Sequence, residues 1–223
     1  QNRRNSDVKL FEWGKTYFKT ETKFKEHSHL SLFISGASTI ENWDTANDGD
    51  VNFYQIKGIV NTIMEKFGMN KFNLRTEESD LACLEYGLKH KVNNIDLVEF
   101  GKVDGATQKQ FDINNEVFHV IFNYDNFIKL VGMNKVIYKE VSKFPSTRRD
   151  LALLIDKAVT YSSIQELASK QERKLLKAIN LFDVYEGKNL PEGKKSYAVS
   201  FQFQDETKTL VDKQIDKVMS KII

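Results

Sequence analysis

Two neighbouring stretches near the end of the chain alternate their side chains with the period of a β-strand. In residues 194–204 large apolar side chains occupy every second position, with small polar ones between them: Tyr197, Val199, Phe201 and Phe203 against Ser196, Ala198, Ser200, Gln202 and Gln204. Alternate residues of a strand face opposite ways, so the apolar set must lie under helices and the polar set must be open. In the preceding stretch, Phe182 and Val184 then join the covered face, and Asp183 and Tyr185 the open one.

The predicted open face holds groups of the kind that bind RNA. Tyr185 and Ser196 share it, and we expect Lys194 and Lys195 at its rim. An exposed aromatic ring stacks on an unpaired base while lysines contact phosphates. A tyrosine on the polar face of an antiparallel sheet is also common without any ligand. An RNA-binding surface and a plain solvated face therefore both stay open on these residues alone.

Arg148 and Arg149 are the other candidates for contact with a polyanion. A guanidinium group presents a fork of donors that suits the oxygens of a phosphate. The structural alternative is a salt bridge to Asp150 or to a neighbouring strand. The sequence does not favour either interpretation.

The remaining reactive side chains do not form a site of known spacing. His27 and His29 point to one side of a strand as metal ligands would, but no third ligand follows at a motif spacing. No glycine-rich phosphate loop and no G-x-S-x-G elbow is present. Cys83 has no recognisable histidine partner, and residues 77–80 look like a solvated acidic loop. We therefore expect no catalytic residue, no metal site and no cofactor in this chain.

The elements around the predicted open face follow the order β-α-β-β-α. A buried strand at 151–155 precedes an apolar helical stripe between 164 and 175, and strands at 176–186 and 194–204 are followed by a helix from about Asp212. This order lacks one strand of the split β-α-β, or ferredoxin-like, pattern. We therefore predict a ferredoxin-like domain over residues 140–223, truncated in its last strand.

The first part of the chain, residues 1–139, has a different character. Apolar residues recur at three- and four-residue steps between 51 and 67, which predicts a helix that ends at Gly68. Shorter strand-like stretches lie at 8–13, 16–18, 30–34, 97–103 and 117–124. Strands and helices are mixed without a repeating β-α unit. The predicted fold class is therefore α+β in both parts.

Composition limits the partners and the compartment. The 223 residues are 40% hydrophobic and 29% charged, as in ordinary globular domains, and no apolar run approaches the roughly 18 residues of a membrane helix. A single cysteine, Cys83, fits a reducing cytoplasm. The formal charge is −1 for residues 1–139 and +3 for residues 140–223, which weakly favours a polyanion as partner of the second part. The polar start without Met suggests a piece of a longer protein.

Four collinear motifs in the last third resemble one family. Residues 144–153 read FPSTRRDLAL, residues 181–187 LFDVYEG and residues 193–198 GKKSYA, and Phe201-Gln202 leads to Thr209-Leu210. These motifs resemble the anticodon-binding domain of bacterial phenylalanyl-tRNA synthetase β subunits. In that family, the positions that match Tyr185 and Ser196 contact the anticodon.

The first part resembles the domain that precedes it in the same family, an antiparallel-sheet module of the class II synthetase kind that has lost catalysis. Residues 11–15, FEWGK, look like its F-E-x-G-K strand, and Trp43 followed by residues 53–58, FYQIKG, looks like its W…F-x-x-x-K-G helix start. Residues 76–82, TEESDLA, depart from the family, whose members often carry His-Pro-Gly there. We carry no function over to that loop.

The resemblance implies partners outside this chain. The family assembles as an α₂β₂ heterotetramer, in which the α subunit activates phenylalanine with ATP and Mg²⁺ and the β subunit helps to bind tRNA(Phe). A catalytic class II module needs arginines on two motifs, whereas Arg3, Arg4 and Arg75 are the only arginines of residues 1–139. The resemblance thus implies a non-catalytic tRNA-binding and assembly portion of a cytoplasmic ligase.

Two alternatives come from other functional classes. One is a small ferredoxin-like enzyme of the acylphosphatase kind, in which Arg148 and Arg149 would cradle a phosphate. The other is an assembly domain whose sheet binds protein and not RNA. Affinity for a protein should respond little to salt, whereas RNA binding should weaken steeply as salt rises.

Overall fold

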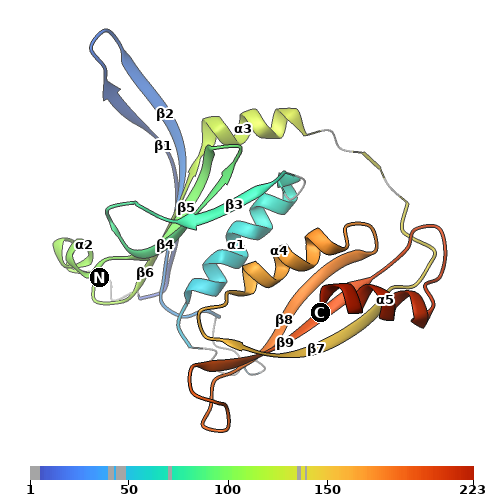
Figure 1. Cartoon of the computed structure of the whole chain (residues 1–223). Coiled ribbons are helices and arrows are strands. Elements are labelled where there is room, and N and C mark those ends of the chain that lie inside the picture. Colours follow the sequence, from blue (N-terminus) through green and yellow to red (C-terminus); the bar gives the residue numbers. More distant parts are fainter. Residues whose placement is uncertain (1–5, 40–42, 44–48, 70–71, 135–136, 139) are drawn as a thin grey trace. The chain divides into compact units, whose positions relative to one another are not determined.

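The computed structural model describes residues 6–39, 43, 49–69, 72–134, 137–138 and 140–223. The chain divides into two compact units, Gln1–Ile137 and Tyr138–Ile223, which we call unit 1 and unit 2 (Figure 1). Each unit has its own sheet and its own hydrophobic core. Both are α+β with antiparallel strands, as the sequence predicts.

Unit 1 is built on a six-stranded antiparallel sheet in the order β1-β2-β6-β5-β4-β3. Its strands are β1 (Val8–Lys19), β2 (Phe24–Ser35), β3 (Leu74–Glu78), β4 (Leu84–Val92), β5 (Ile95–Val103) and β6 (Val117–Asn123), and its helices are α1 (Phe53–Lys66), α2 (Gly105–Gln110) and α3 (Tyr124–Met133). Helix α1 confirms the helix predicted from the apolar periodicity. It begins at a capping box in which Asn52 accepts from the backbone N–H groups of Tyr54 and Gln55.

One face of this sheet packs against α1 and α3. Ile56 and Val60 of α1 are fully buried, and so are Phe100 of β5 and Val120 of β6. The other face of the sheet carries charged groups: Lys89 of β4 is buried and forms ion pairs with Asp80 and Glu99. The structure therefore separates a helix-covered apolar face from a polar face, as expected for an antiparallel sheet.

Unit 2 is a three-stranded antiparallel sheet in the order β7-β9-β8. Its elements are β7 (Thr147–Asp156), α4 (Tyr161–Gln171), β8 (Leu176–Tyr185), β9 (Lys194–Phe203) and α5 (Asp212–Ile222). Both helices contribute to a single core, through Ala168 of α4 and Ile215, Val218 and Ile222 of α5. This is the predicted β-α-β-β-α order of a ferredoxin-like domain. Among the described residues of both units, no helix is long and apolar enough to cross a membrane.

Candidate nucleic-acid interface

Strand β9 sorts its side chains as the alternation predicts. Val199, Phe201 and Phe203 are fully buried in the core of unit 2 and Tyr197 nearly so. The intervening side chains face away from both helices. Ser196 is one of them, and it lies directly opposite Tyr185 of β8 in the antiparallel register. Tyr185 is 44% exposed, so the structure brings these two predicted residues together on the uncovered face of the sheet.

The prediction that Phe182 lies on the covered face of the sheet is wrong. The β8–β9 register shifts between Leu181 and Asp183, leaving Phe182 as the extra residue of a β-bulge. The bulge interrupts the alternation, so Phe182 does not join the covered face but lies 48% exposed. The guanidinium carbon of Arg148, from β7, lies 5.0 Å from the centre of its ring. The uncovered face therefore carries a second aromatic residue that period-2 reasoning misses, because no residue type in the sequence marks the bulge.

Arg148 and Arg149 lie on opposite sides of β7. Arg148 pairs in register with Gln202 on the uncovered face, and its Nε donates to Asp150 Oδ1 at 2.7 Å. Arg149 pairs in register with the buried Phe201, and its Nη2 donates to Asp212 Oδ1 at 2.5 Å. Since Asp212 begins α5, Arg149 links the strand to that helix. The two guanidinium groups do not converge on one point, which speaks against the phosphate cradle of an acylphosphatase-like enzyme.

The two lysines at the start of β9 also separate. Lys194 lies at the rim of the uncovered face, where its Nζ is 2.7 Å from Asp156 Oδ1. Lys195 is buried, and its Nζ lies 4.6 Å from the centre of the Tyr197 ring. The prediction that Lys195 borders the open face is wrong, because it shares the period-2 face of Tyr197 and so packs on the helix side.

Tyr185 owes its position in part to a neighbouring glycine. A Cβ placed on Gly187 would overlap the phenol ring and hydroxyl of Tyr185. The ring therefore lies against the backbone of Gly187, and a side chain at position 187 would displace it from this orientation.

The candidate reactive groups of unit 1 lie apart from one another in the part of the chain that the structure describes. His29 Nε2 is 2.9 Å from Thr16 Oγ1, and no group of three His, Cys, Asp or Glu residues within the described ranges could hold a metal ion. Burial raises the pKa of the Cys83 thiol, which disfavours the reactive thiolate. Arg75 lies on β3, and Arg3 and Arg4 are outside the described residues.

The prediction of an acidic loop near residues 77–80 is wrong for its first half, because residues 77 and 78 end strand β3, and its carboxylates form ion pairs. Glu77 Oε2 lies 2.8 Å from Lys91 Nζ, and Asp80 pairs with the buried Lys89. The lysine hydrogen bonds lower the pKa of both carboxyl groups, so both stay ionised near neutral pH. A general acid at neutral pH needs a raised pKa, which is the opposite of the shift at Glu77 and Asp80.

Comparisons with known proteins match both units. Residues 1–124 match the family described as "Phenylalanyl tRNA synthetase beta chain CLM domain", and residues 142–223 match "Ferredoxin-fold anticodon binding domain". The whole chain is 41% identical to the phenylalanine–tRNA ligase beta subunit of Bacteroides thetaiotaomicron and 42% identical to that of Bacteroides fragilis, covering 28% of each. It is 29% identical to that of Clostridium acetobutylicum over 98% of the chain and 26% of the relative.

The chain thus spans under a third of the length of these relatives. The family model for unit 1 alone accounts for more than half of the chain, and the second model covers most of the rest. The chain therefore belongs to the phenylalanyl-tRNA synthetase β-subunit family, within which it carries the CLM domain and the ferredoxin-fold anticodon-binding domain.

Proposed function

We propose that this chain is the tRNA-binding and assembly portion of a cytoplasmic phenylalanine–tRNA ligase. In this proposal the uncovered face of the β7-β9-β8 sheet binds the anticodon stem-loop of tRNA(Phe). The observation that carries it is the cross-strand pair of Tyr185 and Ser196, with the Tyr185 ring exposed beside a small polar group. Such a face leaves room for a base to lie flat on the ring.

The charges around this face suit a phosphate backbone. Arg148 and Lys194 flank it, each held by one carboxylate, Asp150 and Asp156 respectively. These pairs are largely exposed, and exposed ion pairs contribute only about 0–1 kcal/mol. A phosphate can therefore replace the carboxylate partner of Arg148 or Lys194 at a small cost in free energy. Arg149 and Lys195 point to the helix side, so we assign them structural roles and no direct RNA contact.

The chemistry of the ligase is assigned to a partner. The described residues of unit 1 include one arginine, Arg75, and no cluster of metal-ligating side chains, so they do not fit ATP and Mg²⁺. We infer that these groups bind to the α subunit of an α₂β₂ heterotetramer, and that unit 1 serves in assembly with that subunit. The relatives' shared name, a beta subunit of phenylalanine–tRNA ligase, supports this division.

Binding of a fluorescein-labelled anticodon stem-loop of tRNA(Phe), followed by anisotropy across a salt series, tests the proposal. Tyr185→Ala should weaken binding by about 1–3 kcal/mol, which is a factor of roughly 5 to 150. Affinity should also fall steeply with salt, because lysines and arginines release counterions from the RNA. Tyr54→Ala is the matched control, since Tyr54 is an 80% exposed tyrosine on α1.

Two outcomes would contradict the proposal. If Tyr185→Ala and the unaltered chain bind the stem-loop with equal affinity, the uncovered face is not the RNA-binding site. Failure of the unaltered chain to bind the stem-loop at low salt would leave the alternative of a protein-assembly domain.

A smaller effect is expected from Gly187→Ala. The added methyl group would push the Tyr185 ring out of its present orientation, because the two overlap. Stem-loop affinity should then fall, but by less than in Tyr185→Ala, since a displaced ring still offers a face. Gly193→Ala is the control, because Gly193 lies in the same loop between β8 and β9. Its φ of 77° means that this variant also measures the effect of backbone strain in the loop. Equal affinities for Gly187→Ala and the unaltered chain would show that the glycine does not position the ring.

A further inference from the structure

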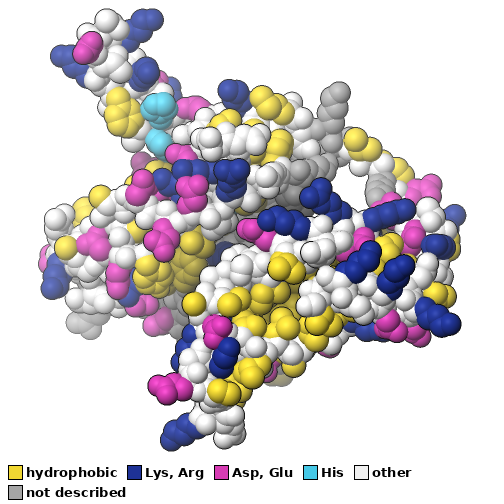
Figure 2. Space-filling view, viewed as in Figure 1, with side chains coloured by type: hydrophobic (Ala, Val, Ile, Leu, Met, Phe, Trp, Pro, Cys, Tyr) yellow, Lys and Arg dark blue, Asp and Glu magenta, His cyan; other side chains and the backbone are white. Residues whose placement is uncertain are grey.

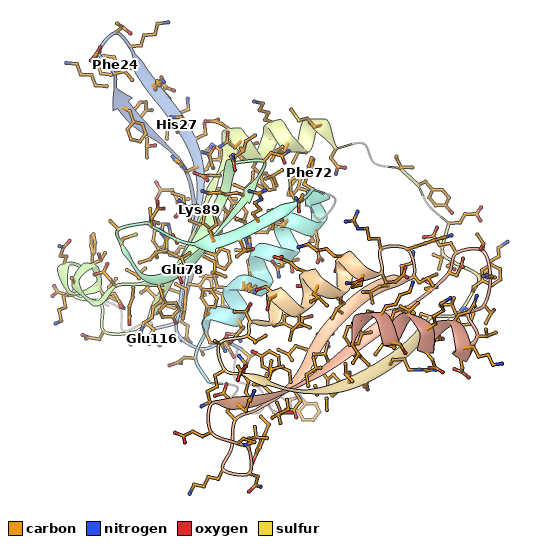
Figure 3. All side chains as sticks on the ribbon, viewed as in Figure 1. Phe24, His27, Phe72, Glu78, Lys89 and Glu116 are labelled. Carbon is orange, nitrogen blue, oxygen red and sulfur yellow. The ribbon has the colours of Figure 1, made fainter. Side chains whose placement is uncertain are left out.

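The β1–β2 hairpin extends well beyond the sheet to which it belongs. Strand β2 pairs with β6 only from His29 to Ser35. Its first half, Phe24–Ser28, pairs only with the end of β1, Lys15–Lys19. Residues 15–28 therefore form a two-stranded arm, which we call the ribbon, and it projects from unit 1 in Figure 1 and carries the labelled Phe24 and His27 in Figure 3.

Three aromatic side chains of the ribbon are turned to solvent. Phe24 is 75% exposed, Tyr17 67% and Phe18 53%. The register places Phe24 opposite Lys19, so Phe24 and Tyr17 share one side, while Phe18 lies on the other side against His27. An isolated two-stranded hairpin is marginally stable in water. Rings exposed on both sides of such an arm make it a candidate surface for contact with a partner.

The charges of the ribbon indicate the kind of partner. Lys15 is neutralised by Glu26 at 2.7 Å, but Lys19, Lys23 and Lys25 form no ion pair with any described residue. On the sheet of the same unit each of three lysines faces two carboxylates instead; these are Lys89, Lys91 and Lys102. Figure 2 shows the dark-blue cations gathered around the tip of the arm. The end of the ribbon thus combines stacking surfaces with uncompensated positive charge.

We propose that the ribbon is a second RNA-binding element, which takes a single-stranded segment. The rings would stack on unpaired bases while Lys19, Lys23 and Lys25 contact phosphates, the combination by which proteins hold single strands without sequence preference. A protein cleft that buried the rings would also have to strip water from three lysines, and burying unpaired charge is costly. A paired duplex offers no free base faces to the rings. The ribbon has two carboxylates, Glu21 at the turn and Glu26, which is paired with Lys15.

The inference rests on the proposed function only in naming RNA as the partner, and the two are tested separately. The probe is a 3′-fluorescein 12-nucleotide oligouridylate, titrated with the 223-residue chain in a salt series. Lys19→Gln, Lys23→Gln and Lys25→Gln combined should lower the magnitude of the slope of log affinity against log salt by about 2, since each single-strand phosphate contact contributes about 0.7. Phe24→Ala should weaken binding about fivefold to a hundredfold.

The controls separate the ribbon from the uncovered face of unit 2. Lys66→Gln, Lys109→Gln and Lys129→Gln combined, which alter three lysines on the helices of unit 1, should leave the slope unchanged. Tyr185→Ala should affect the anticodon stem-loop more than the oligouridylate, and the ribbon variants should do the reverse. A triple-lysine variant that retains both the affinity and the slope for the oligouridylate would overturn the inference and leave the ribbon as a protein contact. Absence of any oligouridylate binding by the unaltered chain would overturn it as well.

Discussion

Unit 1 is expected to lose stability on the order of 3 kcal/mol for each of two buried histidines as the pH falls from about 6.5 to about 4. Burial lowers the pKa of His90 and of His119 from 6.5 to about 4, with Lys57 adding repulsion at His90. In the unfolded chain both groups regain an ordinary pKa and bind protons first. The unfolded state therefore takes up more protons in this window, and acid favours it.

The direction of this pH dependence, and the pH range in which it occurs, follow from the ordinary pKa of 6.5 and the lowered pKa of about 4. Above pH 6.5 both histidines are neutral in either state and contribute no pH dependence. Between 6.5 and 4 the free energy of unfolding falls with each proton bound by the unfolded chain, and below 4 this contribution levels off. Carboxyl groups whose pKa is lowered by hydrogen bonds, such as Glu77, Asp80 and Asp104, add to the loss from the acid end of this window downward, as the pH falls from their ordinary pKa toward the lowered one.

Urea unfolding monitored by tryptophan fluorescence measures the effect in unit 1 alone, because Trp13 and Trp43 are the only tryptophans. His119→Phe is the matched variant: the His119 ring stacks on Phe33 at 4.4 Å with an interplanar angle of 7°, and a phenyl ring can take its place without titrating. The His119→Phe chain should show about half the pH dependence of the unaltered chain. Equal stability at pH 7 and pH 4 would contradict the prediction.

Apolar periodicity predicts the elements that build the cores, because a buried face must repeat with the period of its element. Helix α1 and strand β9 were both found this way, and the structure confirms both. Strands β3 and β4 were not predicted. Strand β4 contains Lys89, His90 and Lys91, whose polar character hides a central strand. The carboxylates that neutralise these lysines come from β3, β5 and the intervening loop, and no local pattern reveals them.

The candidate site was predicted only as far as the alternation holds. Tyr185 and Ser196 follow it and are opposite each other in the sheet. Lys194 and Lys195 are adjacent in sequence, so no strand could place both on one face. The bulge at Phe182 depends on how β8 pairs with β9, which is a property of two strands and not of either sequence. Phe182, the second aromatic residue of the uncovered face, can therefore be identified only once the pairing register of β8 and β9 is known.

Phe182→Ala is expected to weaken binding of the anticodon stem-loop by an amount comparable to Tyr185→Ala, about 1–3 kcal/mol. Phe182 is 48% exposed and Tyr185 is 44% exposed, and both lie near the end of β8 on the uncovered face of the sheet. The guanidinium carbon of Arg148 lies over the Phe182 ring, 5.0 Å from its centre, so a base next to this ring also lies near a cation. The double variant should lose roughly 30-fold to 10⁴-fold in affinity if each ring holds its own base.

A double-mutant cycle in the same anisotropy assay distinguishes two arrangements of the bound loop. Losses that add indicate two bases on two rings, whereas a double variant no weaker than the worse single variant indicates one base held between them. Val184→Ala is the control, because Val184 is 49% exposed on the same strand but pairs in register with Tyr197 of the covered face. Thermal melts of all variants separate lost contact from lost folding. Full affinity in Phe182→Ala would mean that the bulge serves only the geometry of the sheet, and that Tyr185 alone stacks on the RNA.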